Sequence, residues 1–146
     1  MSIELRENEF DPWAELQAYR REGLRAATGS YGATAVFVGT MRDFNEGDSV
    51  RSLFLEHYPG MTERHLEDIC REAAARWDLL DTLILHRVGA ISPDDTIVLV
   101  AAWSAHRAEA FAACRYLIEE LKHRAPFWKK EQLPAGSRWV DSNTPG

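Results

Sequence analysis

The feature that most constrains the fold is a run of eight residues, 96–103, which a long helical pattern follows closely. The run reads Thr-Ile-Val-Leu-Val-Ala-Ala-Trp and contains no charged side chain. Continuous apolar and β-branched residues are typical of a strand that is buried on both faces. We therefore expect residues 96–103 to form a central strand of a sheet.

A helix is predicted directly after this strand, ending at about Arg124. Its apolar residues recur at helical spacing, and they are Ala110, Phe111, Cys114, Leu117, Ile118 and Leu121. Such a stripe predicts a helix that packs this side against the core. Pro126 stops the helix, because proline lacks an N–H and its ring clashes with the preceding turn.

The remaining segments predict a single α+β domain. Strands are expected at residues 3–6, 33–38, 50–57, 79–87, 127–133 and 137–141, the first of them at a sheet edge. Two further helices are expected, one starting at Pro12 after the capping Asp11 and ending near Gly23, the other over residues 61–77. Residues 40–48 are expected as a loop and residues 88–95 as a turn. The order β-α-β-β-α-β-β-α-β-β favours a mixed or antiparallel sheet.

The length of 146 residues and the net charge of −6 limit the class of protein. The length fits one domain over residues 1–146, with residues 141–146 as a frayed tail. An acidic total argues against binding to nucleic acid, which needs a basic face. No apolar run approaches the ~20 residues of a membrane span and no signal region is present, so we expect a cytoplasmic protein without membrane contact. Cys70 and Cys114 fall on apolar helix faces and are expected as buried free thiols.

A basic corner at residues 121–131 is the strongest candidate site. It reads Leu-Lys-His-Arg-Ala-Pro-Phe-Trp-Lys-Lys-Glu in a chain that is otherwise acidic. Lys122 lies in the last turn of the predicted helix, and Lys129 lies a short extended step beyond Pro126. Neighbouring cations and burial lower the pKa of a lysine and make it a usable base or nucleophile. The pattern indicates an anion or proton-transfer site, while a solvated basic helix end is the plain structural alternative.

Two further positions are candidates for anion binding. Arg42 directly follows a buried strand, where binding residues concentrate, although pairing with Asp43 or Glu46 also explains it. His106 and Arg107 precede the long helix, whose free N–H groups favour an anion.

Arg107, His86 and Arg87 also have structural explanations. Arg107 is also explained by charge neutralisation of Glu109. His86 and Arg87 are expected as an exposed pair that closes a strand. Neither metal-ligand spacing nor a glycine-rich phosphate loop is present, so we expect no metal and no cofactor.

Five segments together resemble the large, catalytic subunit of molybdopterin synthase. The segments are residues 37–43, 55–61, 86–89, 104–111 and 121–131, the last being the most specific. This resemblance runs from about residue 3 to residue 140. It implies an α/β-hammerhead domain with a small additional antiparallel β-subdomain.

The resemblance also implies a reaction and its partners. The family transfers sulfur from the C-terminal Gly-Gly thiocarboxylate of a small ubiquitin-like subunit to cyclic pyranopterin monophosphate (precursor Z). Two transfers form the dithiolene of molybdopterin in molybdenum cofactor biosynthesis. The expected assembly is a heterotetramer around a dimer of the large subunit.

Residue roles follow from the resemblance at matching positions. Lys122 and Lys129 match the catalytic lysines. The expected substrate-binding residues are Thr40, Met41, Arg42, His106, Arg107, Lys122, Lys129, Lys130 and Glu131, with His106 and Arg107 reaching the pocket from the neighbouring subunit. Two alternatives stay open: a non-catalytic module that docks a ubiquitin-like protein, and a nucleic-acid-binding domain that uses the basic corner.

Overall fold

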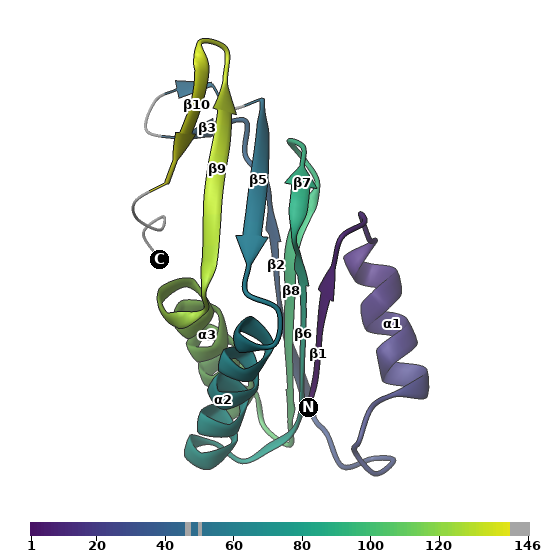
Figure 1. Cartoon of the computed structure of the whole chain (residues 1–146). Coiled ribbons are helices and arrows are strands. Elements are labelled where there is room, and N and C mark those ends of the chain that lie inside the picture. The colour runs from purple at the N-terminus through teal and green to yellow at the C-terminus, as the bar shows by residue number, and fades with distance from the viewer. Residues whose placement is uncertain (46–47, 50, 141–146) are drawn as a thin grey trace.

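The computed structural model describes residues 1–45, 48–49 and 51–140, which form a layered α+β arrangement (Figure 1). A four-stranded sheet lies between helix α1 on one face and helices α2 and α3 on the other. A second four-stranded sheet extends beyond the end of this layered part. This is the α+β architecture that was expected, a main domain with an added antiparallel β-subdomain.

The main sheet is mixed and has the order β1-β6-β8-β2. Its strands are β1 (Ser2–Arg6), β6 (Leu79–Arg87), β8 (Thr96–Ser104) and β2 (Ala33–Thr40). Strands β1 and β6 run parallel, and the other neighbours are antiparallel. The central place of residues 96–103 and the edge place of β1 are therefore confirmed. Strand β2 continues past Gly39, where the sequence predicted its end, with a register shift at that point.

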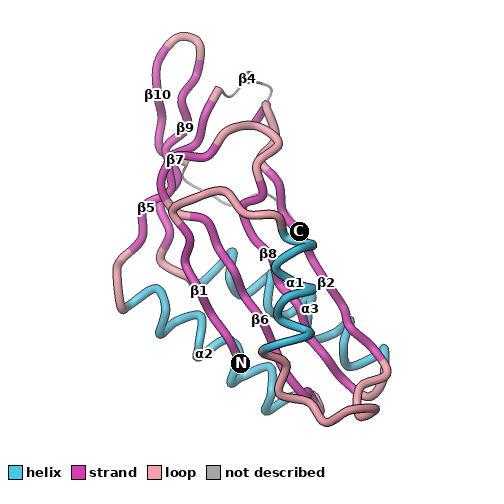
Figure 2. The backbone as a smooth tube through the Cα atoms, turned by 90° about the vertical axis from the view of Figure 1, so that its right-hand side faces the viewer, coloured by secondary structure: helices cyan, strands magenta, loops and turns pink. Residues whose placement is uncertain are grey.

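Three helices cover the two faces of this sheet (Figure 2). They are α1 (Pro12–Glu22), α2 (Met61–Arg76) and α3 (Arg107–Arg124). Asp11 caps α1 as predicted, because its carboxylate accepts hydrogen bonds from the N–H groups of Trp13 and Ala14. Helices α2 and α3 share one core with the sheet, whereas α1 covers the fully buried Trp103 on the opposite face. Strands β6 and β8 are buried on both faces for this reason.

One residue of the predicted apolar face of α3 points outward. Phe111 is 69% exposed, whereas Ala113, absent from the predicted stripe, is fully buried. Phe111 lies four residues from both Arg107 and Arg115, so it shares their exposed side of the helix. The other five residues of the stripe are buried as expected.

The second sheet is entirely antiparallel and has the order β10-β9-β5-β7. Its strands are β5 (Ser52–His57), β7 (Gly89–Ile91), β9 (Phe127–Leu133) and β10 (Gly136–Trp139). The predicted hairpin of β9 and β10 is confirmed. Strand β7 lies where only a turn was expected, and β3 (Phe44–Asn45) with β4 (Asp48–Ser49) forms a short ladder in the predicted loop. The predicted tail, 141–146, lies outside the described residues.

Two further expectations concern the cysteines and the membrane. Cys70 and Cys114 are free, buried thiols, as predicted. Among the residues that the structure describes, none of the helices combines the length and the apolar character that crossing a bilayer would take.

Candidate active site

The basic corner joins helix α3 to strand β9. The helix ends at Arg124, and Ala125 turns into extended backbone with φ −71° and ψ 133°. This is the conformation that a following proline imposes on the residue before it. Strand β9 then starts at Phe127, so the predicted helix end and corner are confirmed.

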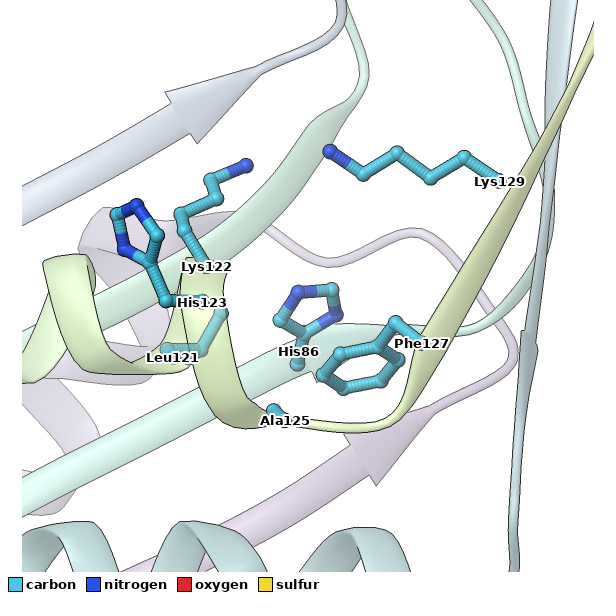
Figure 3. Close-up of a pocket in the computed structure, with 7 residues that line it drawn as sticks. All are labelled: His86, Leu121, Lys122, His123, Ala125, Phe127 and Lys129. Carbon is cyan, nitrogen blue, oxygen red and sulfur yellow. The ribbon is translucent and has the colours of Figure 1, made fainter. Parts of the chain in front are cut away.

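Lys122 and Lys129 approach each other across a small cavity at this corner (Figure 3). Lys122 comes from the last turn of α3 and Lys129 from β9, and their amines share a hydrogen bond. The cavity has a volume of about 150 Å³. Its lining consists of His86, Leu121, Lys122, His123, Ala125, Phe127 and Lys129.

Burial lowers the pKa of both lysines. The pKa of Lys129 falls to about 8, first because burial desolvates its ammonium and then because the Lys122 charge is close. The pKa of Lys122 is also lowered by burial, although its hydrogen bond with Lys129 opposes that shift. The lowered lysine pKa expected from the sequence is therefore confirmed, with burial as the larger cause. A pair of amines in this state can hold one proton and accept another.

His86 completes the floor of the cavity, and sequence reasoning missed it. Its ring stacks on Phe127, with 4.1 Å between ring centroids and an angle of 15° between planes. The prediction of an exposed pair is wrong, because His86 is 2% and Arg87 3% exposed. The signal was present in the preceding Leu-Ile-Leu of residues 83–85, since consecutive apolar residues indicate a strand buried on both faces.

Arg87 and Arg124 form hydrogen bonds that stabilise the structure around the cavity. Arg87 donates a 2.8 Å hydrogen bond to the carbonyl of Ala90 and so holds the turn after β6. Arg124, a basic residue of the predicted corner, is turned toward α2 and donates a 2.9 Å hydrogen bond to Glu72. It is absent from the residues that line the lysine cavity.

A larger neighbouring cavity, of about 460 Å³, brings in the predicted loop residues. Lys122 lines both cavities, and Thr40 and Arg42 line this second one. The Arg42 charge is close enough to contribute to the lowered pKa of both lysines. Met41 is 5% exposed and belongs to a buried apolar cluster beneath the second sheet, so it anchors the loop.

Lys130 and Glu131 lie on opposite faces of β9. Glu131 follows Lys129 by two residues, is 3% exposed, and forms an ion pair with Arg138 at 3.5 Å. Its charge raises the pKa of Lys129 and so opposes the effect of burial. Lys130 is exposed and lies over the ring of Trp139, 5.6 Å from its centroid. The structure therefore brings Glu131, but not Lys130, to the side of Lys129.

His106 and Arg107 lie at the other end of α3 from Lys122. His106 is the N-cap residue and Arg107 the first helical residue, and both side chains are exposed. The rise of a helix places Arg107 about 22 Å from Lys122 along the axis. Within one chain they do not reach the lysine cavity, and their contribution from a neighbouring subunit stays a prediction.

The fold and the cavity define a class of protein. Two partly buried amines with lowered pKa values lie next to a cavity lined by an arginine, and groups of this kind suit an anionic ligand and proton transfer. Residues 5–124 match the family model described as MoaE protein, and the chain belongs to this family. It is therefore an enzyme of molybdenum cofactor biosynthesis, as its relatives are.

Individual relatives support the same assignment. A protein of Ralstonia nicotianae named molybdopterin synthase catalytic subunit is 52% identical over 141 residues, which cover 97% of this chain and 77% of the relative. The solved MoaE structure from Burkholderia ambifaria is 46% identical, covers 99% of this chain and 92% of its own, and superposes with a TM-score of 0.79. A molybdopterin synthase structure from Staphylococcus aureus is 32% identical, with coverage of 93% and 94% and a TM-score of 0.81.

Proposed function

We propose that this chain transfers sulfur from the C-terminal thiocarboxylate of a small ubiquitin-like subunit to cyclic pyranopterin monophosphate, forming the dithiolene of molybdopterin. The observation that carries this proposal is the hydrogen-bonded pair of Lys122 and Lys129 beside the cavity of Arg42. The reaction is inferred from membership of the MoaE family, and the lysines and the arginine of the site are residue types that suit it.

Both proposed reactants are anions, so positive charge in the site is expected. Arg42 offers two parallel donors that suit the oxygens of a cyclic phosphate. Lys122 lines both cavities and so can contact the substrate in one and the partner's tail in the other. Cations held in a partly buried site stabilise developing negative charge more than they would in water.

Lys129 is suited to proton transfer because of its lowered pKa. A group with a pKa of about 8 is present in both protonation states near neutral pH, which favours general acid–base catalysis. In the proposed reaction Lys129 accepts a proton from the substrate side chain, and Lys122 retains one beside the thiocarboxylate.

The proposed assembly is a heterotetramer around a dimer of this chain, in which His106 and Arg107 enter the site of the neighbouring copy. Their exposure at the start of α3 leaves them available for such a contact. We place the reaction in the cytoplasm, a reducing compartment in which Cys70 and Cys114 remain free thiols.

A single-turnover assay tests the proposal. The chain is mixed with a thiocarboxylated small subunit and cyclic pyranopterin monophosphate, and molybdopterin formation is followed for wild type, Lys122→Ala and a control, Arg71→Ala. Arg71 is exposed on α2, where it pairs with Asp68 at 2.9 Å. We expect product from wild type and the control, and a rate at least about 100-fold lower for Lys122→Ala. Folded wild type that binds the small subunit but forms no product would instead indicate a docking module.

A further inference from the structure

We propose that the carboxylate of Glu119 binds the pyrimidine edge of the substrate's pterin ring, accepting hydrogen bonds from a ring N–H and from the exocyclic amino group. This inference deepens the proposed function and rests on it, because it assigns one more binding residue to the same site. It starts from the larger cavity, of about 460 Å³, that Arg42 and Lys122 line.

This cavity combines basic side chains with one carboxylate. Among the described residues that line it, Glu119 is the only one with a carboxylate, whereas Arg42, Arg115 and Lys122 are basic. A carboxylate beside a bound phosphate is unfavourable, because like charges repel each other. A ligand that places its phosphate at one end and N–H donors at the other accounts for both kinds of group.

The ion pair between Glu119 and Arg115 does not explain why the carboxylate lines the cavity. The Nε atom of Arg115 donates a 3.0 Å hydrogen bond to Oε1 of Glu119, one helical turn away. The Arg115 side chain is 70% exposed, so water screens the pair and its contribution to stability is small. The order of the residues is also the less favourable one, since an acidic residue stabilises a helix more when it precedes the basic residue.

A pterin carries the donors that this carboxylate can bind. In the 2-amino-4-oxo pattern of its pyrimidine ring, the N3–H and the 2-amino group lie side by side and point the same way. A carboxylate accepts two parallel hydrogen bonds in this arrangement, as it does from a guanidinium. The pterin edge therefore replaces the exposed Arg115 contact with a donor pair of similar geometry.

An apolar wall near Glu119 suits the faces of the ring. Phe37, Ile97 and Ile118 line the same cavity from β2, β8 and α3. The Phe37 ring lies close to Gly39, because a Cβ added at residue 39 would be 3.2 Å from its Cε1 atom. Phe37 is also 37% exposed, so part of its ring is accessible to a ligand. Apolar and aromatic walls with a few polar groups at the edge are typical of small-molecule sites.

The position of Glu119 on α3 also fits the length of the substrate. Glu119 precedes Lys122 by three residues, so the two lie on one side of the helix with a rise of about 4.5 Å between them. The Glu119 charge raises the pKa of Lys122, which is consistent with this proximity. The pterin can thus lie along the last turns of α3 with its phosphate toward Lys122 and Arg42.

Two probes without a phosphate test the proposed edge contact. 6,7-Dimethylpterin carries the 2-amino group, whereas 6,7-dimethyllumazine has an oxo group in its place. Because neither probe is a phosphate ester, a change in the charge of Lys122 does not dominate the comparison. Ligand-observed NMR with the full chain measures their affinities in the millimolar range. We expect wild type to bind the pterin roughly 30-fold more tightly, since the lumazine oxo group faces the carboxylate. Equal binding of the probes, or binding of neither at millimolar concentration, would overturn the inference.

Variants of α3 separate direct binding from the ion pair. Glu119→Gln keeps the size of the side chain, but its amide can also donate to the lumazine oxo group, so the preference should fall to about threefold or less. Arg115→Gln removes the ion pair and leaves the carboxylate, so the preference should persist. Equal losses in these two variants would assign the effect to the ion pair and overturn direct binding.

Glu120→Gln is the matched control for the loss of a carboxylate on α3. Glu120 forms the same kind of helical ion pair, with Arg124 at 3.0 Å, but it is not among the residues that line the cavity. We expect this variant to keep the wild-type preference for the pterin. A loss as large as that in Glu119→Gln would show that the preference does not depend on Glu119 in particular, and would count against the inference.

Sulfur transfer distinguishes this inference from the proposed function. For cyclic pyranopterin monophosphate, Glu119→Gln should raise KM about 10-fold and leave kcat within about threefold of wild type, because the contact is present before and during the reaction. If wild type prefers the pterin but forms no molybdopterin, the proposed function fails and the binding role stands. If wild type forms molybdopterin and Glu119→Gln keeps both the preference and the KM, the binding role fails.

Discussion

The side-chain hydroxyl of Thr62 donates a 3.1 Å hydrogen bond to the carbonyl oxygen of Pro126, across 64 residues of sequence. Thr62 is fully buried in the first turn of α2, and its Oγ1 also accepts from the N–H of Tyr58 at 3.0 Å. Pro126 lies in the corner between Lys122 and Lys129. A residue outside the cavity lining therefore ties α2 to the corner that carries the two lysines.

Replacement of this threonine should weaken both stability and activity. Thr62→Val keeps the shape but leaves a buried carbonyl without its partner, which reduces the free energy of unfolding by about 1–3 kcal/mol. Urea denaturation measures this loss, and the single-turnover rate should fall along with it. Thr34→Val, at an exposed position on β2, is the control and should stay within about 0.5 kcal/mol of wild type. Equal stability of both variants would show that the Thr62 bond is dispensable.

Lys129 should lower the stability of the free chain in a pH-dependent manner. Its folded pKa is about 8, against an ordinary value of 10.5, so the unfolded chain binds more protons between these values and stability rises with pH in that window. Below pH 8 the full penalty is present. Lys129→Met should therefore raise the free energy of unfolding at pH 7 by on the order of 2 kcal/mol while abolishing turnover.

Denaturation at a series of pH values checks this result. The advantage of Lys129→Met should shrink as the pH rises from 8 toward 10.5, because the folded amine then loses its charge. If the gain in unfolding free energy of Lys129→Met over wild type did not change with pH, better packing of the methionine, and not the loss of a buried charge, would explain it.

The single-turnover rate should follow the protonation of Lys129. As the pH rises through about 8, the neutral amine becomes the main form and the proposed base becomes available. We expect the single-turnover rate to rise with pH, with a midpoint near pH 8, when molybdopterin is measured in quenched samples. Lys129→Arg keeps the charge but cannot lose its proton, so its residual rate should show no such rise. A flat wild-type profile would remove Lys129 from proton transfer.

Glu131 should control the pKa of Lys129. Its buried carboxylate raises that pKa, so Glu131→Gln should move the pH midpoint of Lys129 acylation, followed by peptide mass spectrometry, below 8. The variant also removes the ion pair with Arg138, so Arg138→Gln is the matched comparison that leaves the carboxylate in place. A lower midpoint in Glu131→Gln alone assigns the effect to charge, and equal shifts in both assign it to disturbed packing.

Local rules were sufficient to predict the main elements of the fold and the two lysines. The apolar run of residues 96–103 predicted a central strand, and Pro126 predicted the end of α3, because both depend on neighbouring residues alone. The lowered pKa of Lys122 was expected from nearby cations. Its larger cause, burial, depends on tertiary packing, including the pairing of β9 with β5 from a distant part of the sequence.

Features that depend on distant contacts escaped prediction. The apolar residues 83–85 indicated that His86 is buried, but no local signal shows that Phe127, far along the chain, stacks on its ring. Phe111 was expected in the core because it lies at the edge of the apolar stripe of α3. Helical spacing alone does not show whether an edge residue is buried; that depends on how the helix packs on the sheet, which buries Ala113 and leaves Phe111 exposed. Strand β7 is only three residues long and exists because β5 lies beside it.

The alternation of side chains along β9 has a consequence for variation in the gene. Lys129 and Lys130 occupy opposite faces, so shortening the corner by one codon would bring Lys130 to the place of Lys129. Lengthening it by one codon would bring Trp128 there instead. The adjacent lysine codons therefore make the site more tolerant of a deletion in the corner than of an insertion.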